Sequence, residues 1–116
     1  MKRDLRLFYQ DILDSMDLIN RYIGNKSYFV FRKDIKLVDS VVRRIEIIGE
    51  AVRNIPKLIR DKNKDIVWED FIESRNFLAH VYFGVNYLRL WNFVEKDLPR
   101  LRKVIERMVG EYGRKN

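Results

Sequence analysis

The chain has 116 residues, of which 47% are hydrophobic and 35% charged, so we expect one domain over residues 1–116 with a single buried core. The 24 Lys and Arg residues outnumber the 17 Asp and Glu residues. This basic balance favours an anionic partner such as RNA, DNA, a nucleotide or an acidic protein, although a surface that serves only solubility explains it equally well. The sequence has no cysteine, which excludes disulfides, thiolate metal sites and cysteine nucleophiles. Its apolar runs are far shorter than the ~20 residues that a bilayer requires, and its start lacks the apolar segment of a signal peptide, so we expect a cytoplasmic protein.

Apolar residues recur every three or four positions, which is the period of an α-helix and not of a strand. The first helix is predicted over residues 4–23 and stops at Gly24. Residues 28–31 are an aromatic connector, expected to form about one helical turn. The second helix is predicted over residues 34–54, with Asp34 as its N-cap, and it ends before the proline that follows.

Residues 56–65 are expected to form a short helical turn and then a polar, basic loop. The third helix is predicted over residues 68–83. The last helical segment, over residues 87–110, contains Pro99, which either kinks it or divides it into two helices, the second starting from Asp97 as its cap. The pattern therefore predicts an all-α bundle of four main helices with short connections.

The second predicted helix contains a glycine and two glutamates that helix formation and core packing do not explain. Gly49 costs about 1 kcal/mol of helix propensity, so it indicates a close approach of another helix. Glu46 and Glu50 lie one turn apart and could bind a cation. We expect them instead to pair with arginines, namely Arg43 and Arg53 on the same helix or Arg75 on its neighbour.

The chain's single histidine, His80, lies in the third helix with three other polar residues, Arg75, Asn76 and Tyr82. Histidine can take and give a proton near neutral pH, and the planar fork of arginine suits phosphate oxygens. On an ideal helix His80 lies roughly 120° from the centre of the apolar face, which argues against a core histidine. The cluster therefore points to chemistry on a nucleic-acid backbone.

The same helical arithmetic separates two members of the cluster. Arg75 and His80 lie about 140° apart on an ideal helix, so either the helix is distorted, or the long arginine reaches round it, or another chain completes the site. Cleavage of RNA through its own 2′-hydroxyl needs one group to take a proton and another to give one. One histidine per chain cannot do both at once, which favours a two-fold dimer. With no second histidine and no cysteine, we expect neither a metal nor a cofactor.

Arg75, four further residues, His80, one residue and Tyr82 together resemble the Arg-x4-His-x-Tyr signature of HEPN-domain toxins, the HepT-like family. A lone Arg-x4-His is common, but further blocks in the family's order cover most of the chain: residues 44–53, the Pro56 turn, residues 67–68 and 82–85, Trp91 and residues 97–99. One departure is Glu73-Ser74, where many members have glycine and methionine.

The resemblance implies a four-to-five-helix up-and-down bundle that dimerises with both signature segments at the interface. It further implies a metal-independent endoribonuclease that acts as the toxin of a toxin–antitoxin pair, with Arg75 and His80 as the catalytic pair and Asn76 as a neighbour that shapes the site. The implied antitoxin is a minimal nucleotidyltransferase that attaches AMP to the signature tyrosine, here Tyr82. Because Tyr82 is expected beside Arg75, the added group would fill the cleft and neutralise its charge.

Two other functions fit the sequence. The first is a non-catalytic HEPN module that binds a nucleotide or a partner, and the second is a plain helical interaction domain. Basic residues outside the signature could guide RNA to the cleft, although such runs are usually solvated helix faces. They form two groups, the first being Lys57, Arg60, Lys62 and Lys64 and the second Arg100, Arg102, Lys103 and Arg107.

Overall fold

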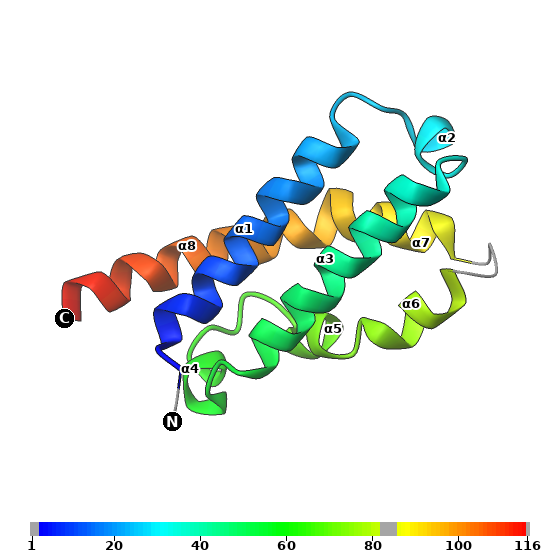
Figure 1. Ribbon diagram of the computed structural model, residues 1–116. Helices are drawn as coiled ribbons and strands as arrows, with labels where there is room; N and C mark the ends of the chain where they lie inside the picture. The colour runs from blue at the N-terminus through cyan, green and yellow to red at the C-terminus, as the bar shows by residue number, and fades with distance from the viewer. Residues whose placement is uncertain (1–2, 82–85, 116) are drawn as a thin grey trace.

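The computed structural model describes residues 3–81 and 86–115, and for residues 80–81 and 114–115 the description covers the backbone alone. The described residues form helices and no strand, which confirms the predicted all-α bundle (Figure 1). No helix within these ranges is both long and apolar enough to cross a membrane.

Two long antiparallel helices, α1 (Leu5–Ile23) and α3 (Ile35–Arg53), form the frame of the bundle (Figure 1). Each begins at an aspartate cap, of which Asp34 was predicted: Asp4 accepts the Arg6 N–H of α1, and Asp34 accepts the Leu37 N–H of α3. Gly24 ends α1 with a φ of 54°, a backbone conformation that glycine adopts without strain. The apolar stripes of the two helices are buried against each other, and α1 also packs against α8. The buried residues of the stripes are Tyr9, Ile12, Met16, Ile19, Val38, Val41, Val42, Ile45, Ile48 and Val52.

Of two short helices, α2 joins the two helices of the frame and α4 leads from the frame to the rest of the chain. The aromatic connector forms the single turn α2 (Tyr28–Phe31), as predicted, and Phe31 is fully buried beside Trp91, with ring centroids 5.2 Å apart. Helix α4 (Lys57–Asp61) follows α3, and the loop after it is held by Asn63, whose carbonyl accepts the Trp68 indole N–H at 2.8 Å. The basic loop is therefore tied to the core.

The single helix predicted over residues 68–83 is wrong. The structure has two helices, α5 (Trp68–Ile72) and α6 (Arg75–Val81), with a turn at Glu73 and Ser74 between them. The Ser74 hydroxyl is buried and donates to the Phe71 carbonyl at 2.9 Å, a local bond that competes with regular helix bonding. The predicted end of this helix lies outside the described residues. The break makes Arg75 the first residue of a new helix.

The last segment is one continuous helical path. It comprises α7 (Tyr87–Asn92), the π-helical turn η1 (Phe93–Asp97) and α8 (Leu98–Lys115). Helix α8 does begin directly after Asp97, but the path is not interrupted there: the Leu98 N–H donates to the Phe93 carbonyl, and this wider turn ends one residue before Pro99. Helix α8 also extends five residues beyond the predicted end at residue 110.

Candidate functional site

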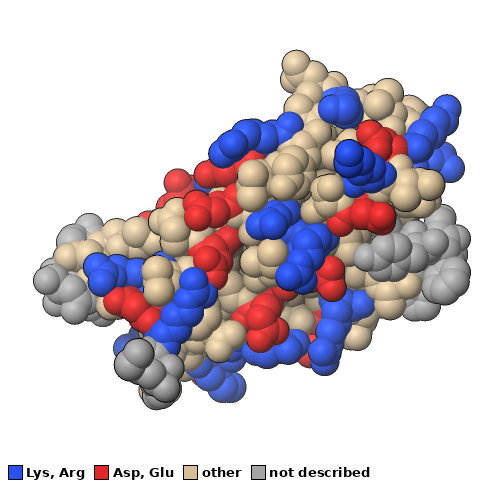
Figure 2. All heavy atoms as spheres, viewed as in Figure 1, with Lys and Arg blue, Asp and Glu red and all other residues tan. Residues whose placement is uncertain are grey.

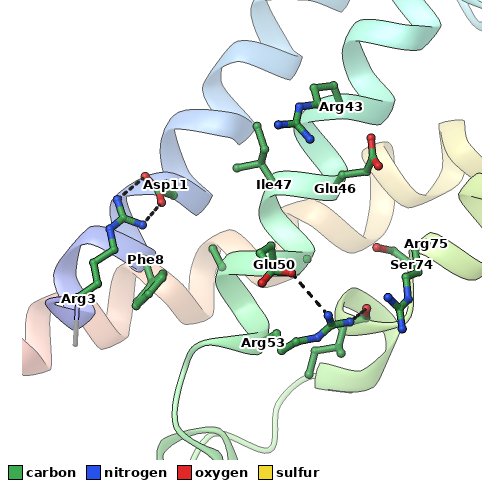
Figure 3. Close-up of a pocket in the computed structure, with 13 residues that line it drawn as sticks. Arg3, Phe8, Asp11, Arg43, Glu46, Ile47, Glu50, Arg53, Ser74 and Arg75 are labelled. Carbon is green, nitrogen blue, oxygen red and sulfur yellow. Dashed lines mark hydrogen bonds and ion pairs between the residues drawn. The ribbon is translucent and has the colours of Figure 1, made fainter. Parts of the chain in front are cut away.

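A cavity of about 410 Å³ lies where α1, α3 and the α5–α6 turn meet (Figure 3). Its lining is mostly charged, with four arginines and three carboxylates: Arg3, Arg43, Arg53, Arg75, Asp11, Glu46 and Glu50. Arg75, the arginine of the sequence signature, is the residue that α6 contributes to it. We refer to this cavity as the arginine cavity.

The wall behind Arg75 depends on the close approach that Gly49 was predicted to allow. A Cβ atom added at Gly49 would lie 2.9 Å from the Phe71 carbonyl oxygen and 3.4 Å from the Ser74 hydroxyl oxygen. Any larger side chain would therefore push α3 away from the α5–α6 turn. The prediction is confirmed, and the contact fixes the point from which Arg75 projects.

Arg53 is the arginine of the cavity that is held in place from two sides. Its Nη1 lies 3.5 Å from the carboxylate of Glu50, which confirms the predicted pairing of that glutamate with an arginine. Its Nη2 donates to the Ile72 carbonyl at 3.4 Å. Both contacts are long for charged partners, so the guanidinium is oriented without having its donors saturated.

The other charged residues of the cavity differ in their pairing. Arg3 is bonded to Asp11 on α1, with both guanidinium Nη atoms on the carboxylate. Glu46, Arg43 and Arg75 line the cavity without an ion pair to any residue that the structure describes. Arg75 is also exposed to solvent, so its charge is available to an anion.

The structure brings only part of the predicted catalytic cluster into view. The backbone of His80 lies in α6 with that of Arg75, but the relation between the two side chains falls outside the description and stays a prediction. Tyr82 lies outside the described residues. Asn76 is exposed and donates to the Glu73 carboxylate at 3.3 Å, and it is not among the residues that line the arginine cavity.

Helix α6 is anchored through its apolar face. Leu78 is buried, and the Phe77 ring lies 5.3 Å from the Phe93 ring of η1. The Arg89 guanidinium covers Phe77 at 4.7 Å, a cation–π contact. Phe77 and Leu78 therefore belong to the packed side of α6, whereas Arg75, its first residue, is exposed.

In the first group of basic residues that could guide RNA, two have hydrogen-bond partners within the chain. Lys57 bonds to Asp61 at 2.9 Å and holds the pKa of that carboxyl below its usual value. Arg60 donates to the Ile55 carbonyl at 3.0 Å, and Lys62 lines a separate hollow between α1, α4 and α8. Figure 2 shows lysines and arginines interspersed with acidic residues over this face of the molecule.

The second basic group also includes two arginines with structural partners. Arg102 on α8 bonds to Asp17 on α1 at 2.6 Å. Arg107 bonds to Asp65 at 2.9 Å, which lowers the pKa of that carboxyl, and to the Asn63 side-chain oxygen at 2.9 Å. These two arginines link α8 to α1 and to the loop before α5.

Several cavity residues were not predicted as site residues. Phe8 and Asp11 come from α1, Arg3 comes from the residues just before α1, and Ser74 comes from the turn before α6. No spacing in the sequence relates them to Arg75, because packing between helices brings them there. Within residues 3–81 and 86–115, no group of three or more histidine, cysteine, aspartate or glutamate residues is placed to hold a metal ion.

Comparison with known proteins identifies the class of this helical domain. Residues 12–108 match the family model described as "Ribonuclease HepT-like". The match spans most of the chain and includes the α3 arginines and residues 75–82, which carry the signature. The chain therefore belongs to the HepT-like ribonuclease family, as its sequence signature had indicated.

Individual relatives agree with this assignment. A Methanocaldococcus jannaschii protein named "Gamma-glutamylcyclotransferase and putative RNase" is 40% identical over 96% of this chain, and the chain spans half of that relative's length. A "Putative RNase" of the same organism is 38% identical over 95% of this chain and 91% of its own. A "Probable ribonuclease HepT" of Thermococcus cleftensis is 34% identical over 93% of this chain and 98% of its own. No solved structure matches.

Proposed function

We propose that this protein is a metal-independent endoribonuclease that cleaves RNA through the RNA's own 2′-hydroxyl. The observation that carries the proposal is membership of the HepT-like family, together with the signature arginine at the edge of a charged, solvent-open cavity. The named relatives support RNA as the substrate.

The proposed reaction uses two side chains of α6. The 2′-oxygen attacks the adjacent phosphorus while the bond from phosphorus to the 5′-oxygen breaks, which leaves a 2′,3′-cyclic phosphate and a free 5′-hydroxyl. His80 transfers one of the two protons, either from the 2′-hydroxyl or to the leaving 5′-oxygen. Arg75 stabilises the negative charge that builds up on the phosphoryl oxygens in the transition state.

A second copy of the chain supplies the other proton-transfer group in this proposal. The chain has one histidine, and a reaction with a general acid and a general base needs two groups. In a two-fold dimer, the α6 helices of both copies would flank one RNA strand. A strictly monomeric active enzyme would contradict this part of the proposal.

We further propose that the protein is the toxin of a toxin–antitoxin pair and is controlled at Tyr82. A minimal nucleotidyltransferase encoded beside it would attach AMP to the Tyr82 hydroxyl. The added phosphodiester carries negative charge next to Arg75, where the substrate phosphate would otherwise bind. Tyr82→Phe should therefore keep ribonuclease activity and become insensitive to the nucleotidyltransferase with ATP.

The decisive experiment compares purified wild-type protein with His80→Ala and with Lys96→Ala, a change on the exposed side of η1. We expect His80→Ala to fold and bind RNA but to lose cleavage, while Lys96→Ala cleaves normally. An otherwise identical oligonucleotide with a 2′-deoxyribose at the cleaved position should be bound and left intact. Cleavage by His80→Ala at the wild-type rate would contradict the catalytic assignment, and binding without cleavage by the wild type would favour a non-catalytic module.

A further inference from the structure

The arginine cavity contains a second cation that the proposed reaction does not use. Arg53, the last residue of α3, lines the cavity together with Arg75, the first residue of α6. In Figure 3 the two guanidinium groups lie toward the same side of the cavity, although their backbones belong to different helices. A strand of RNA that presents one phosphate to Arg75 therefore meets another fixed positive charge close by.

The environment of Arg53 suits a phosphate contact better than a purely structural role. Its side chain is 40% exposed, and its two contacts, to Glu50 and to the Ile72 carbonyl, are 3.5 Å and 3.4 Å long. A guanidinium has five N–H donors, and well-formed charged hydrogen bonds are about 2.7–2.9 Å long. Arg53 is thus aimed by its neighbours but retains donors for a further acceptor.

The other arginines of the cavity are less suited to this role. The guanidinium of Arg3 is already bonded through both Nη atoms to Asp11, on the α1 side of the cavity. Arg43 lies about three helical turns before Arg53 on α3 and also borders a different hollow, with Tyr22 and Lys36. Arg53 is bonded directly to Ile72, which lies just before the turn that carries Arg75. Because of this bond, the position of Arg53 relative to Arg75 is more closely defined than that of Arg3 or Arg43.

We infer that Arg53 binds a backbone phosphate of the RNA next to the scissile one and so sets the register of the strand across Arg75. This inference rests on the proposed ribonuclease function and adds a substrate-binding residue to it. The carboxylate of Glu50 holds Arg53 in the free protein, and the RNA phosphate takes the unsaturated donors when it binds. Phosphate contacts of this kind position a strand and carry no base information, so Arg53 should act on RNAs of any sequence.

The test is a binding experiment with an oligoribonucleotide that carries a 2′-deoxyribose at the cleaved position, so that no reaction occurs. A set of such oligonucleotides has one phosphate at a time replaced by a neutral methylphosphonate. For the wild type we expect about a tenfold loss of affinity when the phosphate contacted by Arg53 is neutralised. Arg53→Gln should bind the unmodified strand about tenfold more weakly and show no further loss at that one position, while the losses at all other positions persist.

Two controls separate phosphate binding from a structural effect. Glu50→Gln breaks the same ion pair but keeps the cation, so it should bind the strand at least as tightly as the wild type. Arg44→Gln removes another positive charge of α3, one that does not line the cavity. It should leave unchanged the pattern of affinity losses along the strand. If Arg53 only stabilised the fold through Glu50, the Glu50 and Arg53 variants would bind RNA equally weakly.

Three results for Arg53→Gln would overturn the inference. The variant could bind the unmodified strand as tightly as the wild type, or it could bind more weakly yet still lose affinity at every neutralised phosphate as the wild type does. It could also lose its sensitivity to neutralisation only at the scissile phosphate. Absence of any binding by the wild type would overturn it as well. Because the experiment measures binding to an uncleavable strand, its outcome is independent of the cleavage assay on His80→Ala. A failure of the catalytic proposal and a failure of this one can therefore be told apart.

Discussion

The α-carbon of Gly49 faces the carbonyl oxygen of Phe71 so closely that a Cβ atom would lie 2.9 Å from it. The backbone of α3 thus packs directly on the end of α5. The turn that follows α5 and precedes Arg75 lies against α3 as well, through Ser74. Gly49→Ala should lower the free energy of unfolding by about 1–3 kcal/mol, since the neighbouring atom is backbone and cannot rotate away. Urea denaturation measures this change.

A matched control for that variant exists in α8. A Cβ atom at Gly110 meets nothing within 4 Å, so Gly110→Ala should stabilise the protein by roughly 0.5–1 kcal/mol through helix propensity alone. The two substitutions therefore have opposite signs. A stabilising Gly49→Ala would show that the contact between α3 and the α5–α6 turn does not limit the fold.

Asn63 is a buried polar residue that joins three segments. Its side chain donates to the Ile59 carbonyl at 2.9 Å and accepts from Arg107 at 2.9 Å, while its backbone carbonyl accepts from Trp68. Asn63→Ala removes both bonds of a buried side chain and leaves the Ile59 carbonyl only the Lys62 N–H, at 3.2 Å, at an expected cost of about 1–3 kcal/mol. Thermal unfolding would detect it, and Asn92→Ala, at an exposed site, should change stability by less than about 0.5 kcal/mol. Equal melting temperatures for the two variants would contradict this account.

The start of α1 should make stability depend on pH in the acid range. The Arg6 side chain and backbone N–H hydrogen-bond to Asp4 and lower the pKa of its carboxyl to about 2. A pKa below the unfolded value, near 3.9, means that the carboxylate stabilises the fold above that value and that this stabilisation is lost as the pH falls toward about 2. Asp4→Asn keeps an N-cap but cannot titrate, so its melting temperature should fall less between about pH 5 and pH 2 than that of the wild type.

A second variant at this position separates the cap from the charge. Asp4→Ala removes both, and its melting temperature should be lower over the whole pH range and not only in acid. Parallel pH profiles for the wild type and Asp4→Asn would contradict the assigned pKa. Circular dichroism melts at a series of pH values provide the measurement.

Chelation should not affect the proposed reaction. In that mechanism Arg75 supplies the positive charge at phosphorus and histidine moves the protons, so no step depends on a divalent ion. Cleavage of a labelled oligoribonucleotide should proceed at the same rate, within about twofold, after dialysis against EDTA and after addition of Mg²⁺. Loss of activity in EDTA that returns with one particular metal would contradict a metal-independent mechanism.

Much of the fold could be predicted because its causes lie close together along the chain. The predicted cap at Asp34 depends on a bond to a residue three positions away, and the helix stripes depend on a fixed period. The break at Glu73-Ser74 was missed because residues 68–83 show a helical pattern throughout. What interrupts it is the buried Ser74 hydroxyl, and its burial follows from α3 lying against this turn.

The amino-acid sequence by itself determined the helical class, because that class follows from the period of the apolar residues. It also carried the ordered motifs, among them the signature with Arg75 and His80, through which the chain resembles the family to which it belongs. Only the tertiary structure decided which other charges accompany Arg75. Arg53 lies 22 positions earlier in the chain and Arg3 lies 72 positions earlier. They share a cavity with Arg75 because α1 packs along α3 and α3 packs against α5 and α6. A pattern along one helix carries no information about such contacts, since they depend on how several helices bury their apolar faces together.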